Sequence, residues 1–118
     1  MIHIKLPWLK FSERGGNKKG NWSSHLKSND NEKNTGYVLA KNLDFKKREV
    51  TKLNGYRVRV VLKPPINRYP DWDNAGNAVK YYQDGICQAL GIDDNEISHA
   101  SIERGLPIKQ GEIWYFIE

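Results

Sequence analysis

Alternating apolar and polar residues predict four β-strands in this chain. Residues 2–8, 55–63 and 96–104 alternate with the period of two that is typical of a strand with one buried face. Residues 112–118 are apolar almost throughout, which favours a fourth strand that closes the chain.

Another segment carries the 3.6-residue period of an amphipathic helix. It runs over residues 75–90, where Asp73 or Asn74 supplies the N-cap and Gly91 ends the helix. The residues predicted to form its buried face are Val79, Tyr82, Ile86, Ala89 and Leu90.

A weaker helical pattern begins at Asn34-Thr35-Gly36 and runs to about Leu53. Residues 10–35 are polar and basic, and we expect them to form one long loop. The elements then follow the order β-α-β-α-β-β. The economical arrangement is a single domain over residues 1–118 with an α/β (α+β) fold, in which the helices pack against one mixed sheet.

Charge is distributed unevenly along the chain. The net charge of +5 and the pI of about 9.3 favour a polyanionic partner. Residues 41–63 hold eight basic residues against two acids, whereas residues 71–96 hold six acids against one lysine. No apolar run reaches the length of a membrane span and the N-terminus lacks a signal-peptide pattern, so we expect a cytoplasmic protein without a membrane partner.

Acidic residues gather at both ends of the stronger helix. In an extended segment, Asp71 and Asp73 point to the same side, so both carboxylates would face one spot. Asp93 and Asp94 follow the helix. The two groups meet only if the chain folds back along the helix after it ends, as a strand starting near residue 96 would do.

Carboxylates brought together repel each other unless a cation neutralises them. Oxygen ligands favour hard cations such as Mg²⁺ or Mn²⁺, and no His or Cys pattern indicates zinc. Lys80 and Asp84 fall on the same helix face as Asp73, either as parts of the site or as an ordinary surface pair.

A series of short motifs runs through these elements: Leu6-Pro7-Trp8, Lys63-Pro64-Pro65, Asp71-x-Asp73-Asn74, Lys80, Asp84-Gly85-Ile86, Ala89-Leu90-Gly91 and Asp93-Asp94. Together they resemble the motifs of the RusA family of Holliday-junction resolvases, many of which are carried by phages and prophages. The similarity is dense over residues 55–97.

The resemblance implies a homodimer that binds four-way DNA junctions in a bacterial host cell and nicks two strands symmetrically with Mg²⁺, for which Mn²⁺ can substitute. It implies that Asp71, Asp73 and Asp94 are catalytic and bind the metal, with Asp93 as an auxiliary metal-binding acid. Lys80 would be the essential catalytic lysine.

One departure concerns that lysine. In some family members it lies one helical turn earlier, where this chain has Asn77, and we interpret the difference as an added turn near the helix start. The departure leaves open a catalytically weak protein of the same fold that binds junctions or single strands. A small nucleotide-hydrolysing enzyme is a further alternative, although it would not need so long a basic segment.

The predicted DNA contacts lie in the polar loop, the weaker helix, the second strand and the loop before the acids: Lys18, Lys19, Lys46, Lys47, Arg48, Arg57, Arg59, Lys63 and Arg68. The alternative for each group is an ordinary solvated surface, which for the strand would deter edge-to-edge aggregation.

Five further residues have simpler predicted roles. His3 is expected on a strand surface rather than as a ligand, and His99 is expected to be structural because a metal can activate water without a base. Cys87 is the single cysteine and is expected to be a buried packing residue. Trp114 and Phe116 are expected to pack into the core or into a dimer interface.

Overall fold

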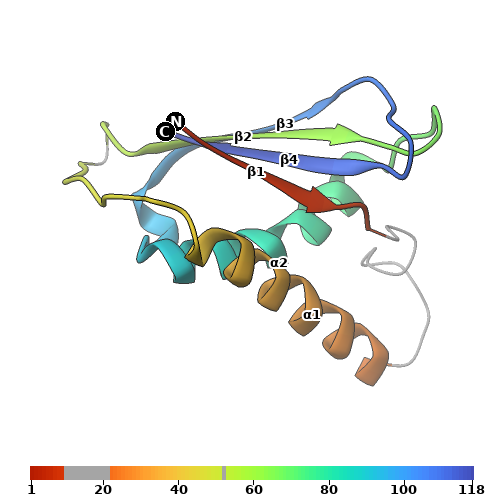
Figure 1. The fold of residues 1–118 in the computed structure, drawn as a ribbon, viewed down its shortest axis with the longest axis horizontal. Helices are drawn as coiled ribbons and strands as arrows, with labels where there is room; N and C mark the ends of the chain where they lie inside the picture. Colours follow the sequence, from red (N-terminus) through yellow and green to blue (C-terminus); the bar gives the residue numbers. More distant parts are fainter. Residues whose placement is uncertain (10–21, 52) are drawn as a thin grey trace.

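Both helices lie on one face of a single four-stranded sheet, so the chain folds in two layers (Figure 1). The computed structural model describes residues 1–9, 22–51 and 53–118, and for residues 22–29 it describes the backbone alone. The elements are β1 (Ile2–Pro7), α1 (Trp22–Lys41), β2 (Tyr56–Lys63), α2 (Trp72–Leu90), the 3₁₀ turn η2 (Asp94–Glu96), β3 (Ile97–Arg104) and β4 (Glu112–Ile117). Among these residues, neither helix combines the length and the apolar character needed to span a bilayer. The predicted α+β fold, with helices packed against one mixed sheet, is confirmed.

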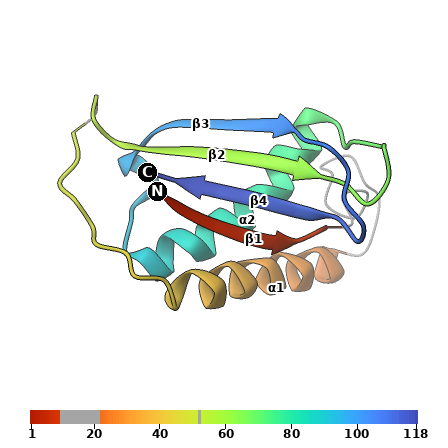
Figure 2. The same cartoon turned by 45° about the horizontal axis from the view of Figure 1, so that its top comes forward.

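The sheet has the strand order β1-β4-β2-β3. β4 pairs antiparallel with both β1 and β2, whereas β3 is parallel to β2. A parallel pair of consecutive strands needs a crossover connection, and α2 provides it. α2 therefore runs against the direction of β2 and β3 and ends near the two chain termini (Figure 2).

The sheet face towards the helices carries the core. The alternation predicts the buried residues Tyr56, Val58, Val60 and Leu62 of β2, and Val61 on the other face is buried as well. The buried residues of β4 are Ile113, Tyr115 and Ile117. Trp114 and Phe116 lie half-buried on the opposite face, so they do not pack into this core, and the alternative of a dimer interface stays a prediction. Nearly every residue of β4 is apolar, and its sequence therefore contains no alternation that identifies the inner face.

α2 begins at Trp72, earlier than predicted, and ends at Gly91, whose φ of 72° is left-handed. Asp71 occupies the N-cap position in place of Asp73 or Asn74. The helix buries most of the face that its periodicity predicts, namely Val79, Tyr82, Ile86 and Leu90, while Ala89 is half-buried. This burial holds α2 against the sheet and leaves its opposite face to solvent.

α1 differs most from the expectation. It spans residues 22–41, so residues 22–35 are helical rather than part of a loop over 10–35, and the helix ends well before Leu53. The pattern Asn34-Thr35-Gly36 lies inside the helix because Gly36 meets α2 there, and a Cβ on it would come within 2.5 Å of the Tyr82 carbonyl oxygen. Helix packing thus overrides the local preference of glycine. The predicted contacts Lys18 and Lys19 lie outside the described residues.

Gly85 on α2 provides the second close contact of this crossing, and it yields a stability prediction. A Cβ on Gly85 would overlap the carbonyl oxygen of Lys33 on α1. We expect Gly85→Ala to lower the free energy of unfolding by about 1–3 kcal/mol, the usual cost of overpacking. Urea unfolding followed by circular dichroism measures the change.

Gly76→Ala is the matched control in the same helix. No atom lies within 4 Å of a Cβ at Gly76, so alanine should raise the free energy of unfolding by about 0.5–1 kcal/mol. If the Gly85 and Gly76 variants were equally stable, the two helices would not be in such close contact.

Candidate active site

Asp71 and Asp73 lie together at the N-terminal end of α2. Asp71 has extended backbone angles (φ −63°, ψ 153°) and its side chain makes no capping hydrogen bond, while Asp73 lies in the first helical turn. Both residues are exposed. The expectation that they alternate along an extended segment is wrong, because the helix begins between them. Both carboxylates lie at the helix start instead, where the positive end of the helix dipole favours their negative charge.

The end of β3 supplies a cation beside this acid pair that the sequence analysis missed. Arg104 lies with its guanidinium carbon 4.4 Å from the centre of the Trp72 ring and 5.4 Å from that of Tyr69. Its Nη2 donates a long hydrogen bond, 3.5 Å, to the Pro70 carbonyl oxygen. The Tyr69 hydroxyl donates to the Gly105 carbonyl oxygen at 2.6 Å. β3 thus holds the loop that delivers the two acids.

Two predicted cations lie on either side of the acid pair in the sequence. Lys80 is exposed two turns after Asp73, which is about 10 Å along the helix axis at 1.5 Å per residue. Asp84 follows one turn later and is half-buried. Arg68 is exposed in the loop that precedes Asp71. Asp73 and Lys80, seven residues apart, therefore lie on one exposed face of α2.

Asp93 and Asp94 lie at the other end of α2. Asp93 caps η2, since its Oδ1 accepts a hydrogen bond from the Asn95 amide at 3.0 Å. Glu96 Oε1 accepts from the Asp93 amide at 2.9 Å, which completes a capping box. Asp94 Oδ1 accepts a long hydrogen bond, 3.4 Å, from Gln83 Nε2. The carboxylate of Asp93 therefore has a structural role, while that of Asp94 remains exposed.

The two acid pairs are separated along α2. Asp94 reaches back to Gln83, which lies ten residues after Asp73, or about 15 Å along the helix axis at 1.5 Å per residue. β3 does fold back along α2, but the second acid pair precedes it, so the strand brings Arg104 rather than Asp94 to Asp71. Over the part of the chain that the structure describes, no three acidic, histidine or cysteine side chains converge on a metal position. One chain thus contributes two separate pairs of acids, because the chain folds back after Gly91 only far enough to bring Asp94 to Gln83.

The donor chemistry of Asp71 and Asp73 nevertheless fits a hard cation. Mg²⁺ is commonly held by one or two carboxylates together with water and phosphate oxygens. Two exposed carboxylates at a helix start satisfy that requirement in part, and a further acid would complete it. Asp71 and Asp73 are therefore the residues of one chain best placed to hold such an ion.

Two of the predicted DNA contacts have structural roles. Lys47 Nζ forms an ion pair with Glu96 Oε1 at 2.9 Å. Arg48 donates from Nη1 to the Asn54 carbonyl oxygen at 2.9 Å and from Nη2 to that of Gly55 at 3.0 Å. The Lys47 pair fastens the irregular segment after α1 to η2, and the Arg48 bonds close that segment on itself, whereas Lys46 in the same segment is exposed.

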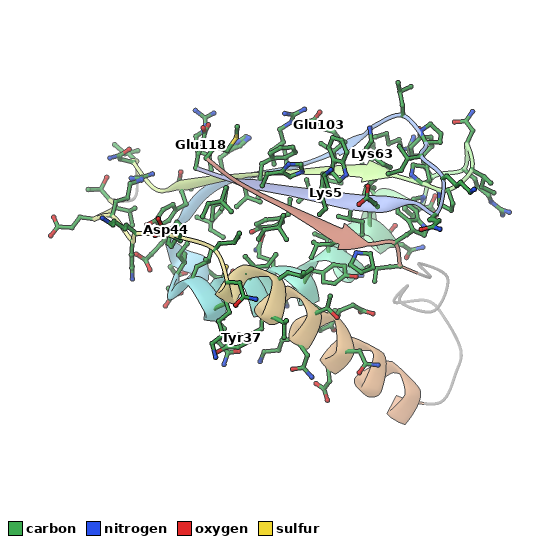
Figure 3. The ribbon with its side chains drawn as sticks, viewed as in Figure 1. Lys5, Tyr37, Asp44, Lys63, Glu103 and Glu118 are labelled. Carbon is green, nitrogen blue, oxygen red and sulfur yellow. The ribbon has the colours of Figure 1, made fainter. Side chains whose placement is uncertain are left out.

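The outer face of the sheet, opposite the helices, carries three predicted contacts on β2. Arg59 pairs with Glu103 on β3, with 3.3 Å between Nη2 and Oε2. Lys63 Nζ lies 4.5 Å from the centre of the Trp114 ring. Figure 3 shows Lys63 and Glu103 on the side of the sheet away from the helices. Arg57 is exposed on the same face, so the alternation placed all three cations correctly, although two already have protein partners.

Residues with predicted simple roles mostly follow the expectation. Cys87 is buried, and burial raises the pKa of its thiol to about 12, so it is a packing residue with little thiolate at neutral pH. His3 lies on the outer face of the sheet and stacks on Phe116, with ring centres 4.2 Å apart. His99 is exposed on β3.

The ion pair at η2 gives a pH-dependent stability prediction. The amide of Asp93, followed by Lys47, lowers the pKa of the Glu96 carboxyl below its ordinary range. A carboxyl whose pKa is lower in the folded than in the unfolded state stabilises the folded protein at pH values above the unfolded-state pKa. This contribution is lost as the pH falls through the folded-state pKa. Glu96→Gln should therefore unfold at a lower urea concentration than the native protein at about pH 7, but at the same concentration at about pH 3.

Glu49→Gln serves as the control for the η2 prediction, because Glu49 is exposed in the neighbouring segment. It should match the native protein at both pH values. A deficit of the Glu96 variant that persisted in acid would show that the glutamine disturbs the turn for a reason other than lost charge.

Comparison with known proteins identifies one relative and no family. No family model matches the chain. An uncharacterized protein from Xylella fastidiosa (strain Temecula1 / ATCC 700964) is 29% identical over 104 residues, which cover 87% of this chain and 67% of that protein. The similarity therefore extends over most of the fold, including both acid pairs in its span of the chain, and assigns no activity.

Proposed function

We propose that this protein is a metal-dependent endonuclease that cuts phosphodiester bonds in four-way DNA junctions. The observation that carries the proposal is the exposed pair Asp71 and Asp73 at the start of α2, with Lys80 on the same helix and Arg104 beside the loop. Carboxylates that hold a divalent cation and cations that bind phosphate are the two requirements of phosphodiester hydrolysis.

Each group has a distinct task in this reaction. A bound Mg²⁺ supplies charge stabilisation at the attacked phosphate and an activated water molecule. Asp71 and Asp73 orient that ion at the helix start. Lys80 stabilises the negative charge that develops on the phosphate oxygens, and Arg68 with Arg104 holds the neighbouring backbone phosphates. These charges interact most strongly with the phosphate once bound DNA has displaced water from the side chains. Cutting therefore follows DNA binding.

A second copy of the chain completes the site in this proposal. Asp94 contacts Gln83, which lies ten residues after Asp73 or about 15 Å along the helix axis, so it cannot share an ion with Asp71 and Asp73 of its own chain. A twofold axis that pairs two α2 helices in opposite directions places Asp94 of the partner subunit beside Asp71 and Asp73. Such a homodimer has two equivalent sites, and two sites related by a twofold axis suit a junction that is cut symmetrically in two strands.

A junction-binding protein with little catalytic power is the second candidate. The observation that favours it is Asn77, which occupies the position where some resolvases of the resembling family have their lysine. Lys80 lies almost one turn further along the helix. In that case the basic residues bind branched DNA while the acid pair cuts it poorly.

Cleavage of a labelled synthetic junction, beside linear duplex of the same sequence, tests the proposal. We expect paired nicks in the junction alone, present with Mg²⁺ and absent with EDTA. Asp73→Asn should slow cutting at least about 100-fold, the scale of losing a group that stabilises the transition state, and should leave junction binding intact.

Asp44→Asn is the control for this assay, because Asp44 is exposed after α1, far from the start of α2 (Figure 3). It should cut at the native rate. Tight, metal-independent junction binding without any nick would contradict the nuclease proposal and favour the junction-binding protein.

A further inference from the structure

Trp72 is an exposed aromatic residue placed between the two acids of the candidate site. Its side chain is 52% exposed, although a tryptophan of this size normally contributes far more to stability when buried. It occupies the first turn of α2, where neither the helix nor the core requires a large ring. The fold therefore keeps a broad, flat, apolar surface in contact with water immediately beside Asp71 and Asp73.

Arg104 lies against this ring. Its guanidinium carbon lies 4.4 Å from the ring centre of Trp72, and its Nη2 is anchored on the Pro70 carbonyl oxygen. Tyr69 lies against the same guanidinium and is itself held by the Gly105 carbonyl oxygen. The ring is thus supported from one side by a cation that is fixed by β3, while half of its surface stays accessible.

The exposed ring matches one chemical group better than others. A flat aromatic surface binds a nucleobase by stacking, and a guanidinium close to it binds the phosphate of the same strand. The base must be unpaired, because in a continuous duplex both faces of each base are already stacked on neighbours. Unpaired bases occur in single strands and at branch points. Branch points are the sites that the proposed nuclease cuts.

We propose that Trp72, supported by Arg104, is a stacking platform for one unpaired nucleobase beside the acid pair. The platform would hold the nucleotide next to the cleaved phosphate out of its stack and so favour branched over linear DNA. This inference rests on the proposed function for its biological purpose. Its binding chemistry, however, is independent of metal and of cutting, so the two can fail separately.

Binding of a fluorescein-labelled octathymidylate in EDTA, followed by fluorescence anisotropy, tests the platform without any cleavage. We expect Trp72→Leu to raise the dissociation constant about 5- to 150-fold, the range for loss of one base–aromatic stack. Trp72→Phe keeps a ring and should stay within about threefold of the native protein. Affinity for a blunt duplex of equal length should be the same for all three proteins.

Leu106→Ala is the matched control, because Leu106 is 78% exposed in the loop that follows β3 but has no flat ring. It should bind both DNAs as the native protein does, and circular dichroism confirms that each variant is folded. The inference is overturned if the native protein does not bind the oligonucleotide, if Trp72→Leu binds it as tightly as the native protein, or if that variant loses affinity for single strand and duplex equally. Cleavage of junctions with unchanged octathymidylate binding by Trp72→Leu would support the nuclease and refute the platform.

Discussion

β2 and β3 run parallel, and a chain that pairs two consecutive strands in this way must return along the sheet between them. α2 makes this return over 19 residues, and its direction determines where every candidate residue lies. The start of the helix holds Asp71 and Asp73, and its end leads to Asp94. Because β3 then runs the other way, its last residue, Arg104, reaches the loop before the helix. The acid pair, its cation and the separation from the second acid pair all follow from this crossover.

Much of this architecture could be predicted from the sequence where one face of an element is buried and the other is wet. β2 alternates apart from the buried Val61, so its inward residues and its outward cations Arg57, Arg59 and Lys63 follow from the pattern. α2 likewise buries the face that its period predicts. In both elements the apolar residues that become buried recur at the spacing of one strand or one helix. The buried face can therefore be predicted from the sequence of that element alone.

The remaining features depend on contacts between distant parts of the chain. Gly36 looks like a helix boundary but lies in α1 because it allows close approach to α2. Trp114 lies on the outer face of a strand that is apolar on both sides, so no alternation could assign it. Arg104 reaches Trp72 across 32 residues through strand pairing, and the distance from Asp94 to Asp73 depends on which element lies between them. Spacing in sequence alone reveals none of these relations.

The central claim is that the acids at the two ends of α2 act together across two subunits. Mixing two inactive variants, Asp73→Asn and Asp94→Asn, in equal amounts and measuring Mg²⁺-dependent nicking of a junction tests it most directly. In a mixed dimer one shared site has lost both acids and the other is intact, so about a quarter of the native nicking per site should return after random exchange of subunits. A mixture of Asp71→Asn with Asp73→Asn, which damages both sites of every dimer, should recover nothing. If the first mixture stayed as inactive as the second, the acids at the two ends of the helix would not form a shared site, and the account would be contradicted.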